Sequence, residues 1–305
     1  MSGEMIGLLG ILVMVFLMLL GMPIAFSMIM AGFLGFACLT SFDGGLFILS
    51  DNFYTQFSSY TMLVIPLFVF MGEIAFHSGI SKRIYNTANA WLGFIPGGLA
   101  VATIGACAGF SAICGSSAAT AATMGTVSLP EMKKNRYDLS LAAGTVAAGG
   151  TLGILIPPSI VLIVYGIQTE VSIGKLFVAG ILPGLLLSML FIGIILTMCI
   201  IKPSLGAPAA KTNLKEKIRS LSGTTEMILL FLLVIGGLLM GWFTPTEAAG
   251  IGAAGAIAIG LIRRSLSWAS FKSAITNTTR TSAMVLLIVA GAMIFSRFLT
   301  ISGLP

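Results

Sequence analysis

The sequence predicts an all-α polytopic membrane protein, and three observations support this fold class. Of the 305 residues, 57% are apolar and only 9% are charged, whereas an ordinary soluble domain is about 25% charged. Apolar runs recur along the whole chain, and at about twenty residues each can cross the hydrocarbon core of a bilayer. The runs are continuous rather than alternating, which excludes a membrane β-barrel. The same composition excludes a soluble enzyme, a nucleic-acid binder and a secreted disulfide scaffold.

Residues 1–60 are expected to form N-terminal scaffold helices and an interfacial segment. Apolar spans are predicted at 5–20 and 24–40, and Pro23 between them removes a helical hydrogen-bond donor. The first run has no basic region before it and no small-residue cleavage site after it, so it predicts a retained helix and not a signal peptide. Residues 42–60 carry acidic and aromatic side chains, which indicates a segment at the membrane interface.

A re-entrant hairpin is predicted at about residues 95–130, within a first repeat core that covers residues 61–201. The core begins with a span at 61–76 and a short basic amphipathic stretch at 81–91, which is typical of a helix lying in the interface. Two apolar arms, each too short to span, then flank the polar stretch GFSAICGSSAATAATMG. Non-helical backbone at membrane depth is tolerated only where protein or a water-filled cavity covers it. This pattern therefore predicts a hairpin that enters and leaves on one face.

A broken helix is predicted next, at about residues 139–168. Its middle reads GTLGILIPPS, and Pro157 and Pro158 cannot continue a helix. The apolar pattern resumes after this break and is followed by a long span at 173–201.

Residues 202–225 form the one hydrophilic linker of the chain and are expected to be cytoplasmic. Residues 226–305 are then predicted to form scaffold helices and the start of a second inverted repeat. A basic amphipathic piece at 263–272 is expected to lie in the interface, separate from the last span. The three predicted spans of this part are 226–241, 246–262 and 281–300.

The distribution of basic residues predicts the orientation of the chain. When the hairpin enters and leaves on one face, most Lys and Arg side chains fall on that face, which the positive-inside rule makes cytoplasmic. The opposite face then holds mostly acidic residues, with Lys175 as its one clear basic residue, and the N-terminus lies outside. The basic residues of the predicted cytoplasmic face are Lys82, Arg83, Lys133, Lys134, Arg136, Lys202, Lys211, Lys215, Lys217, Arg219, Arg263, Arg264 and Lys272.

Two pairs of segments indicate an internal repeat. TMLVIPLFVFMGEIAFHSGI at 61–80 aligns with VLLIVAGAMIFSRFLTISGL at 285–304, and GMPIAFSMIMAG at 21–32 aligns with FTPTEAAGIGAAG at 243–255. The predicted topology gives the two halves opposite directions through the membrane. Inverted repeats with broken helices that meet near the midplane are typical of secondary transporters. Matching the first half would take about 120 further residues after Pro305, so the chain is expected to be C-terminally incomplete.

Three motifs together resemble the large membrane subunit of tripartite ATP-independent periplasmic (TRAP) transporters, over essentially the whole chain. They are GSSAATAATMG at 115–125, PPS at 157–159 and TPTEAAG at 244–250. The resemblance implies an elevator-type sodium symporter of the bacterial inner membrane that imports an organic acid of the sialic acid or C4-dicarboxylate type. It also implies two protein partners, a small membrane subunit (Q-type) and a periplasmic substrate-binding protein (P-type), with no enzymatic activity and no nucleic-acid partner.

The hairpin tip and the broken helix are the predicted sodium and substrate site. Sodium prefers oxygen ligands, which unwound backbone carbonyls and hydroxyl groups supply. The half-helix that begins near Ser117 presents its positive N-terminus, which suits a substrate carboxylate. Cys114 stands where the family often has a serine. The predicted ligands are Cys114, Gly115, Ser116 and Ser117, mainly through backbone atoms, with Thr120, Thr123, Gly150, Thr151, Pro157 and Pro158.

Structural interpretations fit several of these residues as well. The alanines of the hairpin are also typical of close helix packing. Glu73 and Arg297 are intramembrane charges and therefore functional candidates, yet snorkelling or a structural ion pair fits them too. His77 fits a surface polar residue, and Glu247 fits an acidic side chain near a helix start. The four cysteines are expected to act as small buried apolar residues. They are Cys38, Cys107, Cys114 and Cys199.

Two other functions fit parts of the sequence. A single-component sodium/carboxylate symporter would transport without a binding protein, and it remains the alternative. An intramembrane serine protease needs a His within hydrogen-bond reach of its Ser. The chain has a single His, His77, which is expected at an interface, and it has neither a GxGD nor an HExxH motif.

Overall fold

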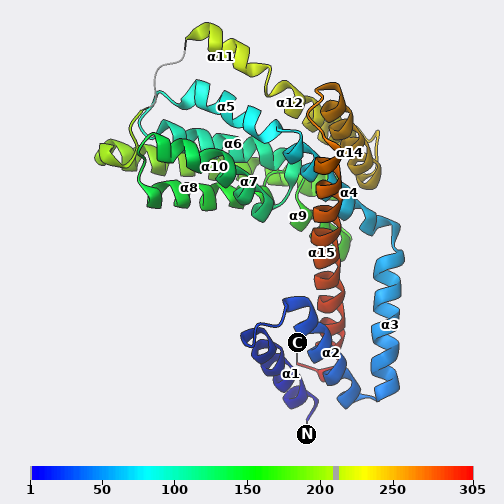
Figure 1. Ribbon diagram of the computed structural model, residues 1–305. Helices are drawn as coiled ribbons and strands as arrows, with labels where there is room; N and C mark the ends of the chain where they lie inside the picture. Colours follow the sequence, from blue (N-terminus) through cyan, green and yellow to red (C-terminus); the bar gives the residue numbers. More distant parts are fainter. Residues whose placement is uncertain (1, 209–212, 305) are drawn as a thin grey trace. The chain divides into compact units, whose positions relative to one another are not determined.

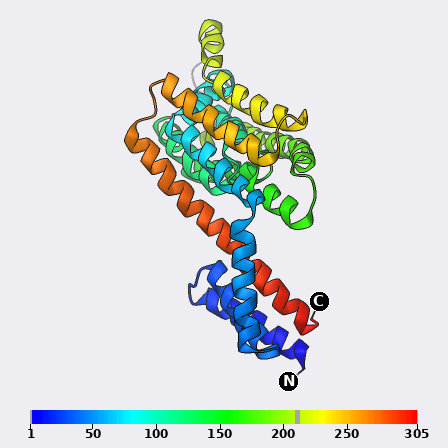
Figure 2. The same cartoon turned by 90° about the vertical axis from the view of Figure 1, so that its right-hand side faces the viewer.

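The computed structural model describes residues 2–208 and 213–304, and all regular secondary structure in these ranges is helical (Figure 1, Figure 2). Within these ranges, five helical stretches are long and apolar enough to cross a membrane, which confirms the predicted fold class of an all-α polytopic membrane protein. They are Tyr60–His77, Ile173–Ile201, Leu214–Leu239, Pro245–Ile262 and Trp268–Ser302.

Contacts divide the chain into two compact units. The first consists of residues 1–63 and 279–305, and the second of residues 64–278. Residues 226–278 are therefore grouped with the predicted repeat core, whereas the sequence-based division places them with the scaffold helices of the second half.

The first unit is built from α1 (Gly3–Leu19), α2 (Ile24–Leu39), α3 (Phe42–Ser58), η1 (Tyr60–Leu63) and the C-terminal part of α15 (Trp268–Ser302). α1 packs along α2, and α2 along α3. The core of this unit gathers aromatic and aliphatic side chains from α2, α3 and α15, with Phe298 fully buried; its buried members are Ala31, Phe36, Ile48, Ile294, Phe295 and Phe298.

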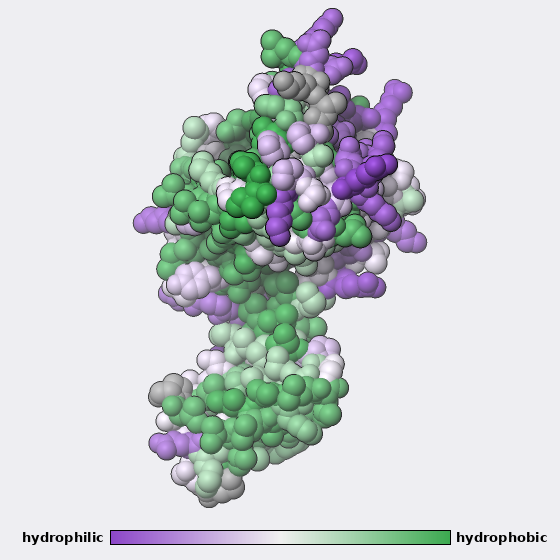
Figure 3. Space-filling model, turned by 90° about the vertical axis from the view of Figure 1, so that its left-hand side faces the viewer, coloured by the Kyte–Doolittle hydropathy of each residue, from purple (hydrophilic) through white to green (hydrophobic). Residues whose placement is uncertain are grey.

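The helices of the first unit expose large apolar side chains. On α1, Leu12, Phe16 and Leu19 are 57%, 59% and 80% exposed, and Figure 3 shows mostly hydrophobic surface over the visible face of this unit. Exposed apolar patches of this extent mark interaction or membrane surfaces rather than a water-facing exterior. In the same unit, Nη1 of Arg297 lies 3.0 Å from Oδ2 of Asp51, which confirms the ion-pair interpretation of Arg297.

The second unit contains the predicted hairpin and broken helix. α4 packs along α14, α5 along α6, and α7 along α8. Its elements are α4 (Val64–His77), α5 (Ile80–Leu92), α6 (Gly98–Cys114), α7 (Ser117–Lys134), α8 (Leu139–Thr151), η2 (Leu152–Ile154), α9 (Ile160–Thr169), α10 (Ile173–Ile201), η3 (Pro203–Leu205), α11 (Leu214–Leu221), α12 (Thr225–Phe231), η4 (Leu232–Gly236), α13 (Gly237–Leu239), α14 (Pro245–Ile262) and the N-terminal part of α15.

The expectation of a basic amphipathic piece at 263–272, separate from the last span, is wrong, because α15 is one helix from Trp268 to Ser302. No glycine or proline lies between Arg264 and Ala290, so nothing in this stretch breaks the helix. The helix start at TPTEAAG is confirmed: Thr244 and Glu247 form a capping box at the beginning of α14.

The cysteines follow the expectation with one exception. All four are free, and Cys107, Cys114 and Cys199 are buried, whereas Cys38 is exposed. Because Cys38 lies on α2, whose surface also exposes Phe26 and Leu34, it is a small apolar residue on an apolar surface rather than in a core.

Asp138 is the N-cap of α8. A hydrogen bond from the Ser140 hydroxyl and bonds from the backbone N–H groups of Leu141 and Ser140 lower the pKa of Asp138. Because this pKa is depressed in the folded state, the ionised side chain stabilises the fold above the unfolded pKa of about 3.9, and the contribution is lost as pH falls through the lower folded value. We expect Asp138→Ala to lower the thermal unfolding midpoint in detergent at pH 7.

Asp138→Asn is the matched variant for this prediction. Its amide oxygen still accepts the backbone N–H groups of the cap, but it does not titrate. Thermal unfolding from pH 7 to pH 3 should therefore show a smaller acid-induced loss of stability for Asp138→Asn than for the wild type. An identical pH profile for the two proteins would show that Asp138 contributes nothing to the acid sensitivity.

Candidate functional site

The stretch predicted as a hairpin forms two helices joined by a tight turn. α6 ends at Cys114, Gly115 has a φ of 65°, and the extended Ser116 is the N-cap of α7. The Ser116 hydroxyl accepts a hydrogen bond from the Ala119 N–H at 3.4 Å, and the Ser116 carbonyl accepts one from the Thr120 N–H at 3.0 Å. α6 and α7 pack against each other, so the polar sequence between the apolar arms marks the turn.

The second predicted break is also a break in the structure. α8 ends at Thr151, a short 3-10 turn follows at Leu152–Ile154, and α9 begins only at Ile160. The peptide bond between Pro157 and Pro158 is cis. Ser159 caps α9, because its hydroxyl accepts from the Leu162 N–H at 3.4 Å and donates to the Ile154 carbonyl at 2.7 Å.

The two breaks are in direct contact. The Gly115 carbonyl accepts a hydrogen bond from the Ile160 N–H at 3.2 Å. A Cβ on Gly115 would lie 2.4 Å from the Pro158 carbonyl oxygen, and one on Gly153 would lie 2.6 Å from the Ser116 carbonyl oxygen. The structure therefore brings the hairpin tip and the broken helix together so closely that only glycine fits at both positions. We call this contact, residues 114–117 with residues 150–159, the crossing.

Backbone oxygens gather at the crossing, but side chains contribute unevenly. A Cβ on Gly150 would lie 3.2 Å from the Ser117 carbonyl oxygen, so this carbonyl also faces the second break. Thr120 is fully buried, and its hydroxyl has no hydrogen-bond partner within residues 2–208 and 213–304. Thr151, in contrast, is exposed and its hydroxyl donates to the Ala148 carbonyl at 2.6 Å.

The base of the hairpin is fixed by residues 205–207. The Tyr137 hydroxyl accepts from the Leu99 N–H at 3.2 Å and donates to the Ala207 carbonyl at 2.8 Å. The N–H groups of Gly97 and Asp138 donate to the carbonyls of Gly206 and Leu205 at 3.1 and 3.0 Å. The start of α6 and the end of α7 are thus held by one segment, which positions both arms.

A pocket of about 190 Å³ lies beside the hairpin. Cys114 and Thr123 line it from α6 and α7, and Glu73 and Asn277 line it from α4 and α15. From the sequence, Glu73 is only a charge at the end of a span, and its place next to the hairpin is not predictable because no spacing relates residue 73 to residues 114–126. The only signal for it was the rarity of a carboxylate within an apolar span.

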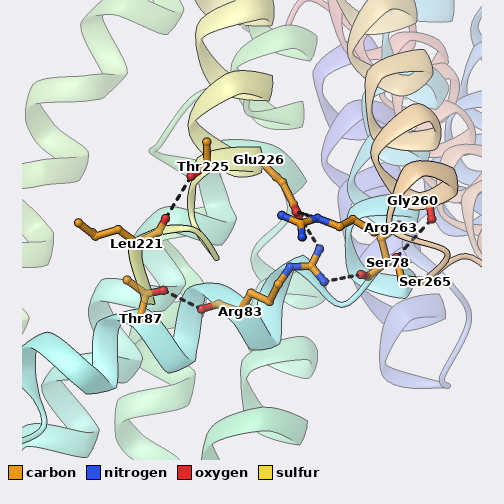
Figure 4. A network of polar contacts seen from close by, with 9 residues as sticks. All are labelled: Ser78, Arg83, Thr87, Leu221, Thr225, Glu226, Gly260, Arg263 and Ser265. Atoms are coloured by element: carbon orange, nitrogen blue, oxygen red, sulfur yellow. Dashed lines mark hydrogen bonds and ion pairs between the residues drawn. The ribbon is translucent and has the colours of Figure 1, made fainter. Parts of the chain in front are cut away.

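An ion network lies elsewhere in the second unit (Figure 4). Nη2 of Arg83 on α5 lies 2.6 Å from Oε2 of Glu226 on α12, and Nε of Arg263, just after α14, binds the other carboxylate oxygen. Glu226 is 6% exposed. Arg83 also donates to the Ser78 carbonyl at 3.1 Å, and the Thr87 hydroxyl donates to the Ser220 carbonyl at 2.6 Å. The network ties three helices together and contacts neither break.

Comparisons with known proteins agree on one family. A family model described as "Tripartite ATP-independent periplasmic transporter, DctM component" matches residues 11–305. The chain is 38% identical over 247 residues to the "C4-dicarboxylate TRAP transporter large permease protein DctM" of Pseudomonas aeruginosa, an alignment that covers 81% of this chain and 57% of that protein. It is 32% identical over its full length to the "Sialic acid TRAP transporter large permease protein SiaM" of Vibrio cholerae, covering 69% of that protein.

A further relative joins two components in its name. The chain is 36% identical over 253 residues to the "Isethionate TRAP transporter permease protein DctMQ" of Oleidesulfovibrio alaskensis, which covers 83% of this chain and 40% of that protein. The chain thus spans little more than half of the Pseudomonas aeruginosa relative and less than half of this one.

Proposed function

The chain belongs to the DctM family of tripartite ATP-independent periplasmic transporters, and on this premise we propose that it acts as the large permease subunit of a sodium-driven importer of an organic acid. The observation that carries the proposal is the crossing, where carbonyl oxygens of each helix break lie against glycines of the other break. Unwound carbonyls at broken helices are how secondary transporters coordinate sodium. The proposed activity is transport, with no chemical step.

The crossing suits a hard monovalent cation for two reasons. The carbonyls of Ser116, Ser117 and Pro158 crowd the glycines opposite them, and the buried Thr120 hydroxyl lacks a hydrogen-bond partner among the described residues. A buried polar group without a partner is costly, and a bound cation would satisfy its oxygen. The sodium ion is transported cargo, held by oxygens around Gly115, Ser116, Ser117 and Thr120.

The organic acid would bind next to the sodium ion. The N-terminus of α7 begins at Ser117, and the partial positive charge of a helix N-terminus favours a carboxylate. We propose an acid of the C4-dicarboxylate or sialic acid type, because relatives named for both kinds match the chain. The elevator motion, in which the hairpin carries its cargo across the membrane, is part of the same proposal.

The proposed assembly contains two more proteins. A small membrane subunit would bind this chain in the bilayer, as the fused name DctMQ of one relative suggests, and a periplasmic binding protein would deliver the acid. The basic loops favour a cytoplasmic position for residues 202–225 by the positive-inside rule. The N-terminus is accordingly proposed to be periplasmic, in a bacterial inner membrane.

Uptake into proteoliposomes tests the proposal. With the small subunit and the binding protein present, import of the radiolabelled acid should require an inward sodium gradient and persist after the proton gradient is dissipated. The expected loss without sodium is at least about tenfold, which corresponds to about 1.4 kcal/mol. Import driven by protons alone would contradict sodium coupling, and full import without a binding protein would identify a single-component carrier instead.

A further inference from the structure

Glu73 on α4 is a carboxylate with few partners. Its side chain is 16% exposed. Oε2 accepts a hydrogen bond from Nδ2 of Asn277 at 3.1 Å and lies 3.8 Å from Nε2 of His77. Oε1 has no hydrogen-bond partner within the described ranges of the chain. One oxygen of the carboxylate is therefore held in place, and the other is free to bind a ligand.

The free oxygen belongs to a pocket with a second unpartnered polar group. Thr123 on α7 is 5% exposed and lines the pocket; its hydroxyl has no hydrogen-bond partner within the described residues. The rest of the lining is mostly apolar, and none of the described lining residues is a Lys or Arg; these other residues are Gly72, Phe76, Phe110, Cys114, Ala119, Ala122, Thr126 and Asn277.

The charge of the pocket decides what it can bind. A carboxylate within an apolar span is costly unless an opposite charge compensates it. An organic acid would be repelled by Glu73, whereas a small cation would be attracted by it. Glu73 Oε1, the Thr123 hydroxyl and the side-chain oxygen of Asn277, whose Nδ2 is already used, are all hard ligands that suit an alkali cation.

We propose that this pocket, formed by Glu73, Asn277 and Thr123, binds a sodium ion at a second seat beside the hairpin. Gly115, Ser116 and Pro158 of the crossing do not line it, so the two seats have different ligands and share only Cys114. The inference rests on the proposed sodium coupling and adds a second ion to it. Because Glu73 lies on α4, Thr123 on α7 and Asn277 on α15, a bound ion ties the hairpin arm to two other helices.

Thermal unfolding of the purified full chain in detergent tests the second seat directly. Sodium chloride is titrated against choline chloride at constant ionic strength, since a ligand that binds only the folded state raises its stability. If the chain has two sodium seats, its thermal unfolding midpoint should rise more steeply with sodium concentration than binding of one ion would allow. For Glu73→Gln we expect the remaining response to be that of one seat, with about tenfold or more sodium needed for the wild-type shift.

Two further variants keep the test informative. Thr123→Val removes one proposed ligand with little change in shape and should weaken the sodium response in the same direction, including if Glu73→Gln does not fold. Glu131→Gln removes an exposed carboxylate near the end of α7 and should leave the sodium response as in the wild type.

The outcomes separate this inference from the proposed function. A wild-type sodium response in both Glu73→Gln and Thr123→Val overturns the second seat and leaves the crossing as the sodium site. A wild-type chain that sodium does not stabilise overturns both proposals. A third outcome also overturns the second sodium seat. In it, lowering the pH in sodium-free buffer stabilises the wild type but not Glu73→Gln, and sodium has no effect at fixed pH, so the pocket binds a proton instead.

Discussion

Replacing Gly115 with alanine is expected to reduce sodium-dependent uptake by more than about tenfold. Gly115 has a φ of 65°, a conformation that costs a residue with a Cβ about 1 to 2 kcal/mol. The added Cβ would also lie 2.4 Å from the Pro158 carbonyl oxygen, and backbone cannot move away as a flexible side chain can. The two breaks must separate, so the close approach of carbonyl oxygens and glycines at the crossing is lost. We expect uptake in proteoliposomes to fall by more than about tenfold.

The matched control for this prediction is Gly144→Ala on α8. No atom lies within 4 Å of the Cβ that this change adds, and alanine is favoured over glycine inside a helix by up to about 1 kcal/mol. Gly144→Ala should therefore keep wild-type uptake and equal or greater thermal stability. If Gly115→Ala assembled normally and transported like Gly144→Ala, the crossing would not be the site of coupling.

The order of the helices could be predicted from the sequence because apolar length and proline carry most of that information. Pro23 marks the end of the gap before α2, Pro157 and Pro158 mark the second break, and the span at 173–201 coincides with α10. α15 could not be predicted as one helix, because the polar residues of 272–283 resemble a loop by hydropathy although none of them breaks a helix. Hydropathy indicates which residues are buried or in contact with lipid. It does not indicate where a helix ends, so a polar stretch without a helix-breaking residue can remain helical.

The site could be predicted only where it is local in sequence. The turn at Gly115 and Ser116 is encoded by adjacent small and polar residues, and so is the break around Pro157. Their contact is tertiary: Gly153 faces Ser116 because α7 packs along α8, which no spacing reveals. The same holds for Glu73, whose partner Asn277 is distant in sequence. Thr151 adjoins the second break in sequence, and its hydroxyl donates a hydrogen bond within its own helix.

Replacing Glu226 with alanine is expected to cause a large loss of stability. Glu226 is 6% exposed and binds both Arg83 and Arg263. Removing one member of a buried ion pair costs about 3 to 5 kcal/mol. The Arg263 side chain is 52% exposed and that of Arg83 is 28% exposed, so water can solvate part of the two remaining charges. We therefore expect the free energy of unfolding to fall by about 2 to 3 kcal/mol, measured by thermal unfolding in detergent.

The exposure of the three partners also predicts an order of effects. Arg263→Ala should cost least, because its side chain is half exposed and Glu226 keeps Arg83; Arg83→Ala should cost more, because Arg83 also holds the Ser78 carbonyl. Glu216→Ala on α11 is the control, since its side chain is exposed and such changes usually stay within about 0.5 kcal/mol. Equal effects of Glu226→Ala and Glu216→Ala would show that the network adds nothing to stability. An effect of Glu226→Ala on the sodium dependence of uptake would instead place the network within the coupling mechanism, against the separation from both breaks that the structure shows.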